Sequence, residues 1–181
     1  MNLMDVILSR RSVRNYVDDD IDDDVLDRIL EAGLLAPTSR NRKPCEFIVV
    51  KDKDVLKQLS ESKASGSGML AGCNVAIVVI ADSDKADTWI EDSSIAMAYM
   101  DLMANYYGIG CCWCQSHLRF SGDGVKSEDV VRNILSLENK YRIVGILSLG
   151  VKEFDLEPHT LSEIDKNKVK YIKWMENFIF H

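Results

Sequence analysis

Apolar residues repeat with helical spacing along much of the chain. Between Ile21 and Leu34 they lie three or four positions apart, which is the period of one face of a helix. Aspartates lead this stretch, where the helix dipole favours negative charge, and Pro37 ends it. Similar patterns predict shorter helices that begin at Asp5 and run into the arginines at 10–14, over 53–62 and over 127–137.

One longer helix is predicted from Thr88 to Tyr107, and Gly108 and Gly110 follow it as a stop signal. It carries apolar or small residues nearly all the way round. A helix of this kind is buried on several sides. We therefore expect it either at the centre of the domain or in a subunit interface.

Four short segments, rich in apolar and β-branched residues, are predicted as strands: 45–52, 74–82, 111–114 and 141–151, the first two of them buried. Helices and strands therefore mix along the sequence, which predicts an α/β or α+β fold. The pattern does not give the strand order. With 181 residues, 3 prolines and no linker-like stretch, the chain is expected to form one domain over 1–181.

The charge balance restricts the partners. A formal net charge of −7 argues against a general affinity for nucleic acid or an anionic membrane, so any anion site must be local. No apolar run approaches the roughly 20 residues that span a bilayer. The N-terminal stretch lacks the basic segment of a secretory signal. We therefore expect a cytoplasmic protein.

The stretch "SRRSVRNY" is the first candidate site, because Arg10, Arg11 and Arg14 surround Ser12 in an otherwise acidic chain. Guanidinium groups on one helical turn can bind phosphate or carboxylate. An exposed basic patch paired with the neighbouring aspartates explains the spacing equally well. The serine hydroxyl slightly favours the anion site.

Two further stretches could bind a ligand. "APTSRNRKP" (36–44) is dense in hydrogen-bonding groups and lies between a helix and a strand, although an ordinary polar loop has the same composition. "GIGCCWCQS" (108–116) has glycines that permit close backbone approach at a helix end. It matches neither the Rossmann nor the P-loop pattern.

Catalytic side chains are scarce. The 3 histidines are far apart and show no metal-ligand spacing. A thiol among Cys111, Cys112 and Cys114 could act as a nucleophile with His117, but an apolar "CCWC" strand with free buried thiols is the simpler interpretation in a reducing cytosol. A cofactor that carries the chemistry would explain the scarcity.

The ordered set of motifs resembles the FMN-dependent nitroreductase family. "SRRSVRNY", then "APTSRNRKP", a helix of small residues ending in "YYGIGCCW", and a late strand "ILSLGV" before a basic tail match that family in order and separation over nearly the whole chain. The resemblance implies an α+β fold with a central mixed, mainly antiparallel sheet flanked by helices. It also implies a homodimer with two FMN molecules at the interface, each bound by both subunits.

The implied FMN contacts fall into three groups. They are Arg10, Arg11, Ser12 and Arg14 for the phosphate and ribityl chain; Pro37, Thr38, Ser39 and Asn41 for the flavin, from the partner chain; and Gln115 and Ser116 beside the isoalloxazine, where backbone amides would bond its reactive nitrogen. The implied activity is transfer of hydride from NADH or NADPH to FMN and on to a nitroaromatic, quinone or similar acceptor, by a ping-pong mechanism without a catalytic side chain. A flavin-binding sensor or storage protein, and a specialised reductase such as a dehalogenase, are alternatives on the same fold.

The chain departs from the family pattern at several positions. Thr38 stands where the family usually has serine, which keeps the hydroxyl, and Cys45 replaces an aromatic residue that commonly follows the loop's last proline. A basic residue near the C-terminus often completes the phosphate site. The candidates for that role here are Lys166, Lys168 and Lys170.

Overall fold

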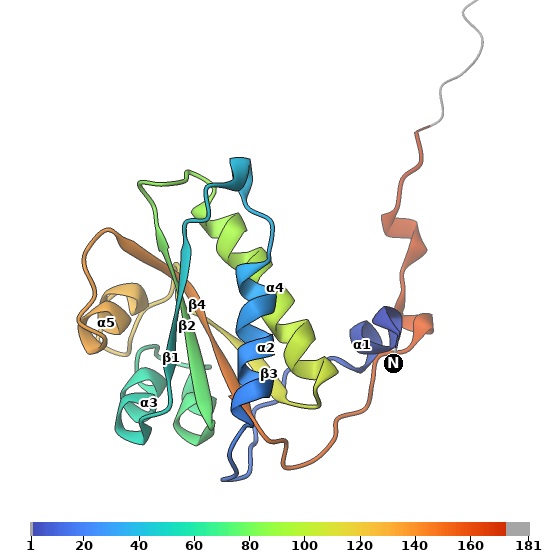
Figure 1. The fold of residues 1–181 in the computed structure, drawn as a ribbon, viewed down its shortest axis with the longest axis horizontal. Helices are drawn as coiled ribbons and strands as arrows, with labels where there is room; N and C mark the ends of the chain where they lie inside the picture. The colour runs from blue at the N-terminus through green and yellow to red at the C-terminus, as the bar shows by residue number, and fades with distance from the viewer. Residues whose placement is uncertain (1, 173–181) are drawn as a thin grey trace, which may run out of the picture.

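A four-stranded antiparallel sheet forms the centre of the computed structural model, which describes residues 2–172 (Figure 1). Its strands are β1 (Cys45–Val50), β2 (Val75–Asp82), β3 (Gly110–Gln115) and β4 (Tyr141–Gly150), in the order β1-β2-β4-β3. All three strand pairings are antiparallel, and one isolated parallel bridge joins Ser12 to Cys111. The predicted α+β class is confirmed.

The central strands are buried on both faces. Every residue of β2 is buried, because helices cover both sides of an uninterrupted apolar run. The prediction of a buried strand at 45–52 was wrong in part, because β1 lies at an edge of the sheet and exposes Glu46 and Val49.

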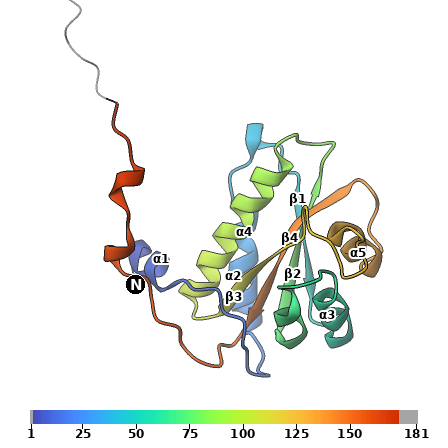
Figure 2. The same cartoon turned by 180° about the vertical axis from the view of Figure 1, so that it is seen from behind.

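Helices cover the two faces of the sheet in pairs (Figures 1 and 2). On one face lie α2 (Asp23–Leu34) and the long α4 (Trp89–Tyr106), which pack on Ile77, Val79 and Leu147. On the other face lie α3 (Lys53–Ser60) and α5 (Ser127–Ile134). The alternation of side chains along β2 thus supplies both halves of the core.

The short helix α1 (Leu3–Ser9) and the segment after β4 lie beyond α4, away from the sheet (Figures 1 and 2). The two are joined where the amide of His159 donates to the carbonyl of Leu8 at 2.8 Å. Charged and large apolar residues alternate over 166–180, which predicts an amphipathic tail. This tail lies partly outside the described residues, and its described end exposes Tyr171 and Ile172. No helix within residues 2–172 has the length and hydrophobicity to cross a membrane.

The prediction that the arginines share a helical turn was wrong. Helix α1 ends at Ser9, and Arg10 already has an extended backbone. The backbone after Ser9 is extended because it bonds to distant parts of the chain. The amide of Val13 donates to the carbonyl of Cys111 at 2.9 Å, and Tyr16 forms an isolated antiparallel β-bridge with Lys152. Residues 10–16 therefore run as an extended segment past the start of β3.

Candidate functional site

The outer edge of β3 carries backbone amides that point away from the sheet. The amide of Ser116 donates inward to the carbonyl of Val144 at 2.9 Å, while the carbonyl of Cys111 accepts from outside the sheet. Because these directions alternate along a strand, the amides of Trp113 and Gln115 face outward. Within residues 2–172, neither has a backbone acceptor. This edge can therefore donate hydrogen bonds to a ligand.

The side chains around Gln115 are already fixed by one another. Its Oε1 accepts from the indole Nε1 of Trp113 at 2.9 Å, and its Nε2 donates to the carbonyl of His117 at 3.2 Å. The Ser116 hydroxyl is buried and has no hydrogen-bond partner in the described part of the chain. Of the two residues predicted beside the isoalloxazine, only Gln115 has a backbone amide that faces outward.

The extended segment places cationic side chains at the beginning of this edge. Arg14 is exposed and donates to the carbonyl of Ser12 at 3.1 Å. Arg10 reaches the carboxylate of Asp101 on α4, with 3.5 Å between Nη1 and Oδ2. Arg11 instead donates to the carbonyl of Glu157 in the segment after β4. The arginines thus diverge, and Arg10 and Arg14 stay near β3.

Sequence reasoning missed Lys63, which follows α3. It is half-buried, and it lies close enough to the thiols of Cys112 and Cys114 to lower their pKa. Arg14 acts on Cys112 in the same direction. Burial outweighs both cations and raises the pKa of each thiol overall. No local motif marks Lys63, because it is a single lysine in a polar loop that only the tertiary fold brings to β3.

Four of the five cysteines, Cys73, Cys111, Cys112 and Cys114, are buried. Burial raises the pKa of Cys73 to about 11 and that of Cys111 well above its ordinary value. A nucleophilic thiol requires the opposite shift. The ring of His117 bonds to Glu128 and not to a thiol, with 2.5 Å between Nδ1 and Oε1. The arrangement favours the structural interpretation of the "CCWC" strand.

The loop predicted to contact the flavin, residues 37–41, lies at the opposite end of α4. The amide of Ser39 donates to Asp92 Oδ1 at 2.9 Å, near the start of that helix. The backbone of Arg40, Asn41 and Lys43 has positive φ of 51, 55 and 48°, a conformation that costs a non-glycine residue energy and that is often found at functional sites.

The structure thus brings only two of the three predicted groups together within one chain. Arg10 touches Asp101, and Ser39 touches Asp92, nine residues earlier on the same helix. At 1.5 Å per residue these contacts are about 13 Å apart along α4. Residues 10–14 and 111–115 lie side by side, but residues 37–41 of the same chain do not join them.

Comparison with known proteins shows the family of the chain. The model of the Nitroreductase family matches residues 7–67 and 61–151. The chain belongs to the nitroreductase family. It is 38% identical to a Clostridium difficile R20291 structure named FMN-dependent nitroreductase, with a TM-score of 0.90 over 94% of this chain and 99% of that one. A C. difficile 630 nitroreductase family protein has 26% identity and a TM-score of 0.78, over 96% of this chain and 100% of that one.

A curated relative from Archaeoglobus fulgidus supports the same assignment. It is 34% identical over 151 residues, which cover 81% of this chain and 83% of that protein. It is provisionally named NADH dehydrogenase/NAD(P)H nitroreductase.

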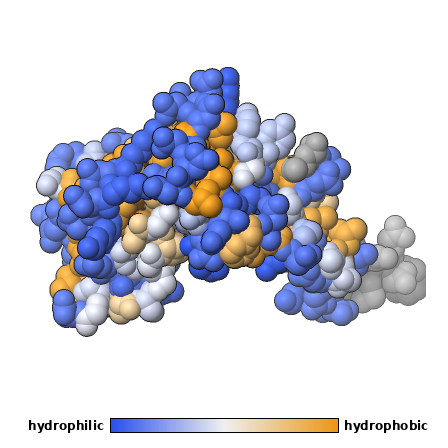
Figure 3. Space-filling model, turned by 90° about the horizontal axis from the view of Figure 1, so that it is seen from below, coloured by the Kyte–Doolittle hydropathy of each residue, from blue (hydrophilic) through white to orange (hydrophobic). Residues whose placement is uncertain are grey.

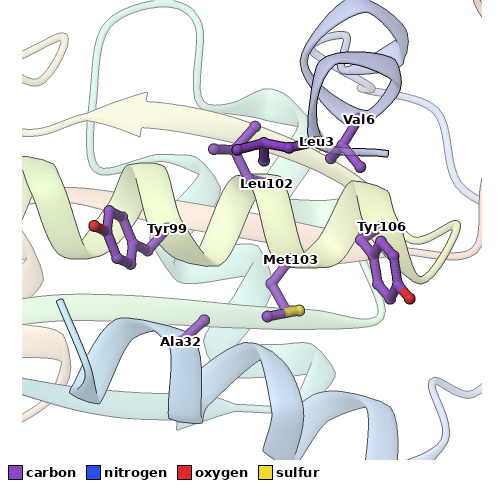
Figure 4. Close-up of a pocket in the computed structure, with 7 residues that line it drawn as sticks. All are labelled: Leu3, Val6, Ala32, Tyr99, Leu102, Met103 and Tyr106. Atoms are coloured by element: carbon purple, nitrogen blue, oxygen red, sulfur yellow. The ribbon is translucent and has the colours of Figure 1, made fainter. Parts of the chain in front are cut away.

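This nitroreductase-family chain also exposes an apolar groove. The groove of about 390 Å³ lies where α1 and α2 approach α4, and its lining residues are Leu3, Val6, Ala32, Tyr99, Leu102, Met103 and Tyr106 (Figure 4). On α1, Met4 and Ile7 are exposed as well. In the space-filling view, apolar residues also reach the surface among hydrophilic ones at the end of the molecule where α1 lies (Figure 3).

Proposed function

We propose that the protein is an FMN-dependent oxidoreductase. In this proposal NADH or NADPH supplies hydride, and a nitroaromatic, a quinone or a similar small molecule receives it by a ping-pong mechanism. The observation that carries the proposal is the open edge of β3, which combines an outward amide at Gln115 with cations at its other end. The names of the C. difficile and A. fulgidus relatives support the same chemistry.

The residues present fit FMN in charge and in length. From Cys111 to Gln115 the strand rises by four residues, or roughly 14 Å, which is comparable with the extended cofactor from phosphate to ring. Arg10, Ser12 and Arg14 would hold the phosphate and ribityl chain, and Lys63 adds a cation beside the strand. A dianionic phosphate explains why an acidic chain gathers cations at this edge.

FMN would supply the hydride transfer itself, and this chain's residues would bind and orient it. Gln115 would donate its outward amide to the ring. Its side chain, held by Trp113 and His117, keeps that part of the strand rigid. Preorganised amides of this kind stabilise negative charge without the cost of reorientation.

A homodimer would complete the site. Residues 37–41 are too far along α4 to reach residues 10–14 of the same chain, and a second copy packed on the exposed face of α4 could bring its own 37–41 loop there. Pro37, Thr38, Ser39 and Asn41 would then contact the flavin from the partner subunit. The apolar groove between α1 and α4 supplies the surface that such a partner would bury. The place of action would be the cytoplasm.

The test is an absorption spectrum of the purified protein between about 300 and 550 nm, before and after NADH or NADPH is added without oxygen. An oxidised flavin spectrum that bleaches on addition is the expected result. A stable yellow protein that neither donor bleaches would indicate flavin binding without turnover. A colourless protein that takes up no added FMN would contradict the whole proposal.

A double variant tests the two arginines. Arg10→Ala with Arg14→Ala should weaken FMN binding at least about 100-fold, because each charge-assisted contact is worth about tenfold. Arg28→Ala is the control, since Arg28 is an exposed arginine paired with Glu31 on α2. Undiminished FMN in the double variant would overturn the assignment of Arg10 and Arg14.

A further inference from the structure

The carboxylate of Asp101 is largely buried and lies between the guanidinium of Arg10 and the thiol of Cys111. Its side chain is 17% exposed, and its Oδ2 lies 3.5 Å from Arg10 Nη1. Its Oδ1 has no hydrogen-bond partner among residues 2–172. Burial raises the pKa of Asp101, although the Arg10 guanidinium opposes that shift. Holding a carboxylate in this position costs folding energy, which calls for an explanation beyond packing.

Asp101 lies on the face of α4 that contacts the end of α1 and the beginning of the extended segment 10–16. One turn further along the same face, Asn105 Nδ2 donates to the carbonyl of Val6 at 3.0 Å and to Ser9 Oγ at 2.8 Å. Asn105 therefore fixes the backbone at the end of α1. Asp101 contacts the side chain of Arg10, which directly follows Ser9 in the chain.

An apolar side chain in the place of Asp101 would avoid the cost of taking a carboxylate out of water. The carboxylate is better explained by its effect on Arg10. A free arginine side chain samples many rotamers, and ordering them costs binding energy. A carboxylate that engages one nitrogen of the guanidinium restricts those rotamers and leaves its other donors available.

We propose that Asp101 is a positioning residue that holds the Arg10 guanidinium in place for the FMN phosphate. This inference rests on the proposed function. The carboxylate acts through Arg10 and does not itself contact the cofactor. Its contribution depends on its being a hydrogen-bond acceptor, so an amide of the same shape should largely replace it.

The experiment compares FMN with riboflavin, which lacks the phosphate. Dissociation constants for both are measured by quenching of flavin fluorescence on the full chain freed of flavin. Asp101→Leu should weaken FMN binding about tenfold and leave riboflavin binding unchanged, whereas Asp101→Asn should stay within about threefold of the wild type for FMN. Asp101→Ala repeats the loss of the acceptor without the leucine side chain, in case Asp101→Leu fails to fold. Asp23→Ala, which removes an exposed carboxylate paired with Lys51, is the control.

The effect must also depend on Arg10. In an Arg10→Ala background, Asp101→Leu should change FMN affinity less than twofold. Equal weakening of FMN and riboflavin, additive losses in the double variant, or tighter FMN binding in Asp101→Leu would each overturn the positioning role. If the wild type binds neither flavin, the proposed function itself fails. If the wild type binds both and Asp101→Leu leaves the ratio of the FMN and riboflavin dissociation constants unchanged, only the positioning role fails.

Discussion

Glu128 joins three parts of the structure through one buried carboxylate. The side chain is 8% exposed and comes from α5. It accepts from Arg142 Nε at 2.9 Å on β4 and lies 2.5 Å from His117 Nδ1, directly after the Gln115 and Ser116 stretch. Burial opposes ionisation, but the hydrogen bonds from Arg142 and His117 prevail and lower the pKa of Glu128.

Removing this carboxylate with Glu128→Ala takes an acceptor from two side chains, Arg142 and His117, and from the backbone amide of Ile143. Breaking a fully buried ion pair costs about 3–5 kcal/mol. Arg142 is 36% exposed and keeps its stacking over Trp89, 4.6 Å from the ring centroid, so part of that cost is recovered in water. We expect a loss of about 2–3 kcal/mol in the free energy of unfolding. In a chain of this size that lowers the melting temperature by roughly 4–12 °C.

The assay is thermal unfolding of the wild type, Glu128→Ala and Glu128→Gln as a function of pH. Because the folded pKa of Glu128 lies below its ordinary value of 4.5, the stabilisation is complete above about pH 4.5 and is lost as pH falls through the folded value. The advantage of the wild type over Glu128→Gln should therefore shrink on acidification. An advantage that stays constant from neutral pH to about pH 3 would refute the reasoning.

The control is Glu138→Ala, which removes an exposed carboxylate 3.4 Å from Lys140. It should cost less than about 0.5 kcal/mol. A loss below about 1 kcal/mol in Glu128→Ala would likewise show that the network contributes no more than a surface pair.

Two further predictions concern the proposed cofactor site. Lys63→Gln should raise the FMN dissociation constant about tenfold, and the exposed control Lys57→Gln should leave it unchanged; equal constants for the two variants would remove Lys63 from the site. Tyr99→Glu, in the apolar groove, should shift sedimentation toward the mass of one chain and reduce FMN retention, whereas Val125→Glu, at an exposed position outside the groove, should do neither. A Tyr99→Glu variant that sediments like the wild type would argue against this dimer surface.

The sequence was sufficient to locate the elements whose patterns are strong. An uninterrupted β-branched run predicted β2, an apolar segment broken by glycine and serine predicted β4, and the predicted small-residue helix agrees with α4 to within one residue at each end. The prediction that the arginine segment is helical was wrong, because it rested on the spacing of nearby residues alone. The bond from Val13 to Cys111, almost a hundred residues away, decides its conformation, and no local pattern contains such a contact.

The candidate site was only partly predictable for the same reason. The resemblance implied four residues within 10–14, four within 37–41, and Gln115 and Ser116, but it marked neither Lys63 nor Asp101. Lys63 is notable because it lies beside buried thiols of β3, and Asp101 because it pairs with Arg10. Such relations between side chains exist only once α3 and α4 have packed on the sheet.

The open edge of β3 links the fold to the proposed chemistry. An edge strand with unpaired amides invites pairing with another chain, so proteins usually cover it. Here the segment at Ser12 and Val13 covers the edge only at Cys111, and the amides of Trp113 and Gln115 lie beyond it. A flat cofactor that accepts hydrogen bonds along this edge would satisfy those amides and block pairing with a foreign strand. In the proposed binding mode, the flavin ring would therefore cover the part of the sheet edge that is left without backbone partners.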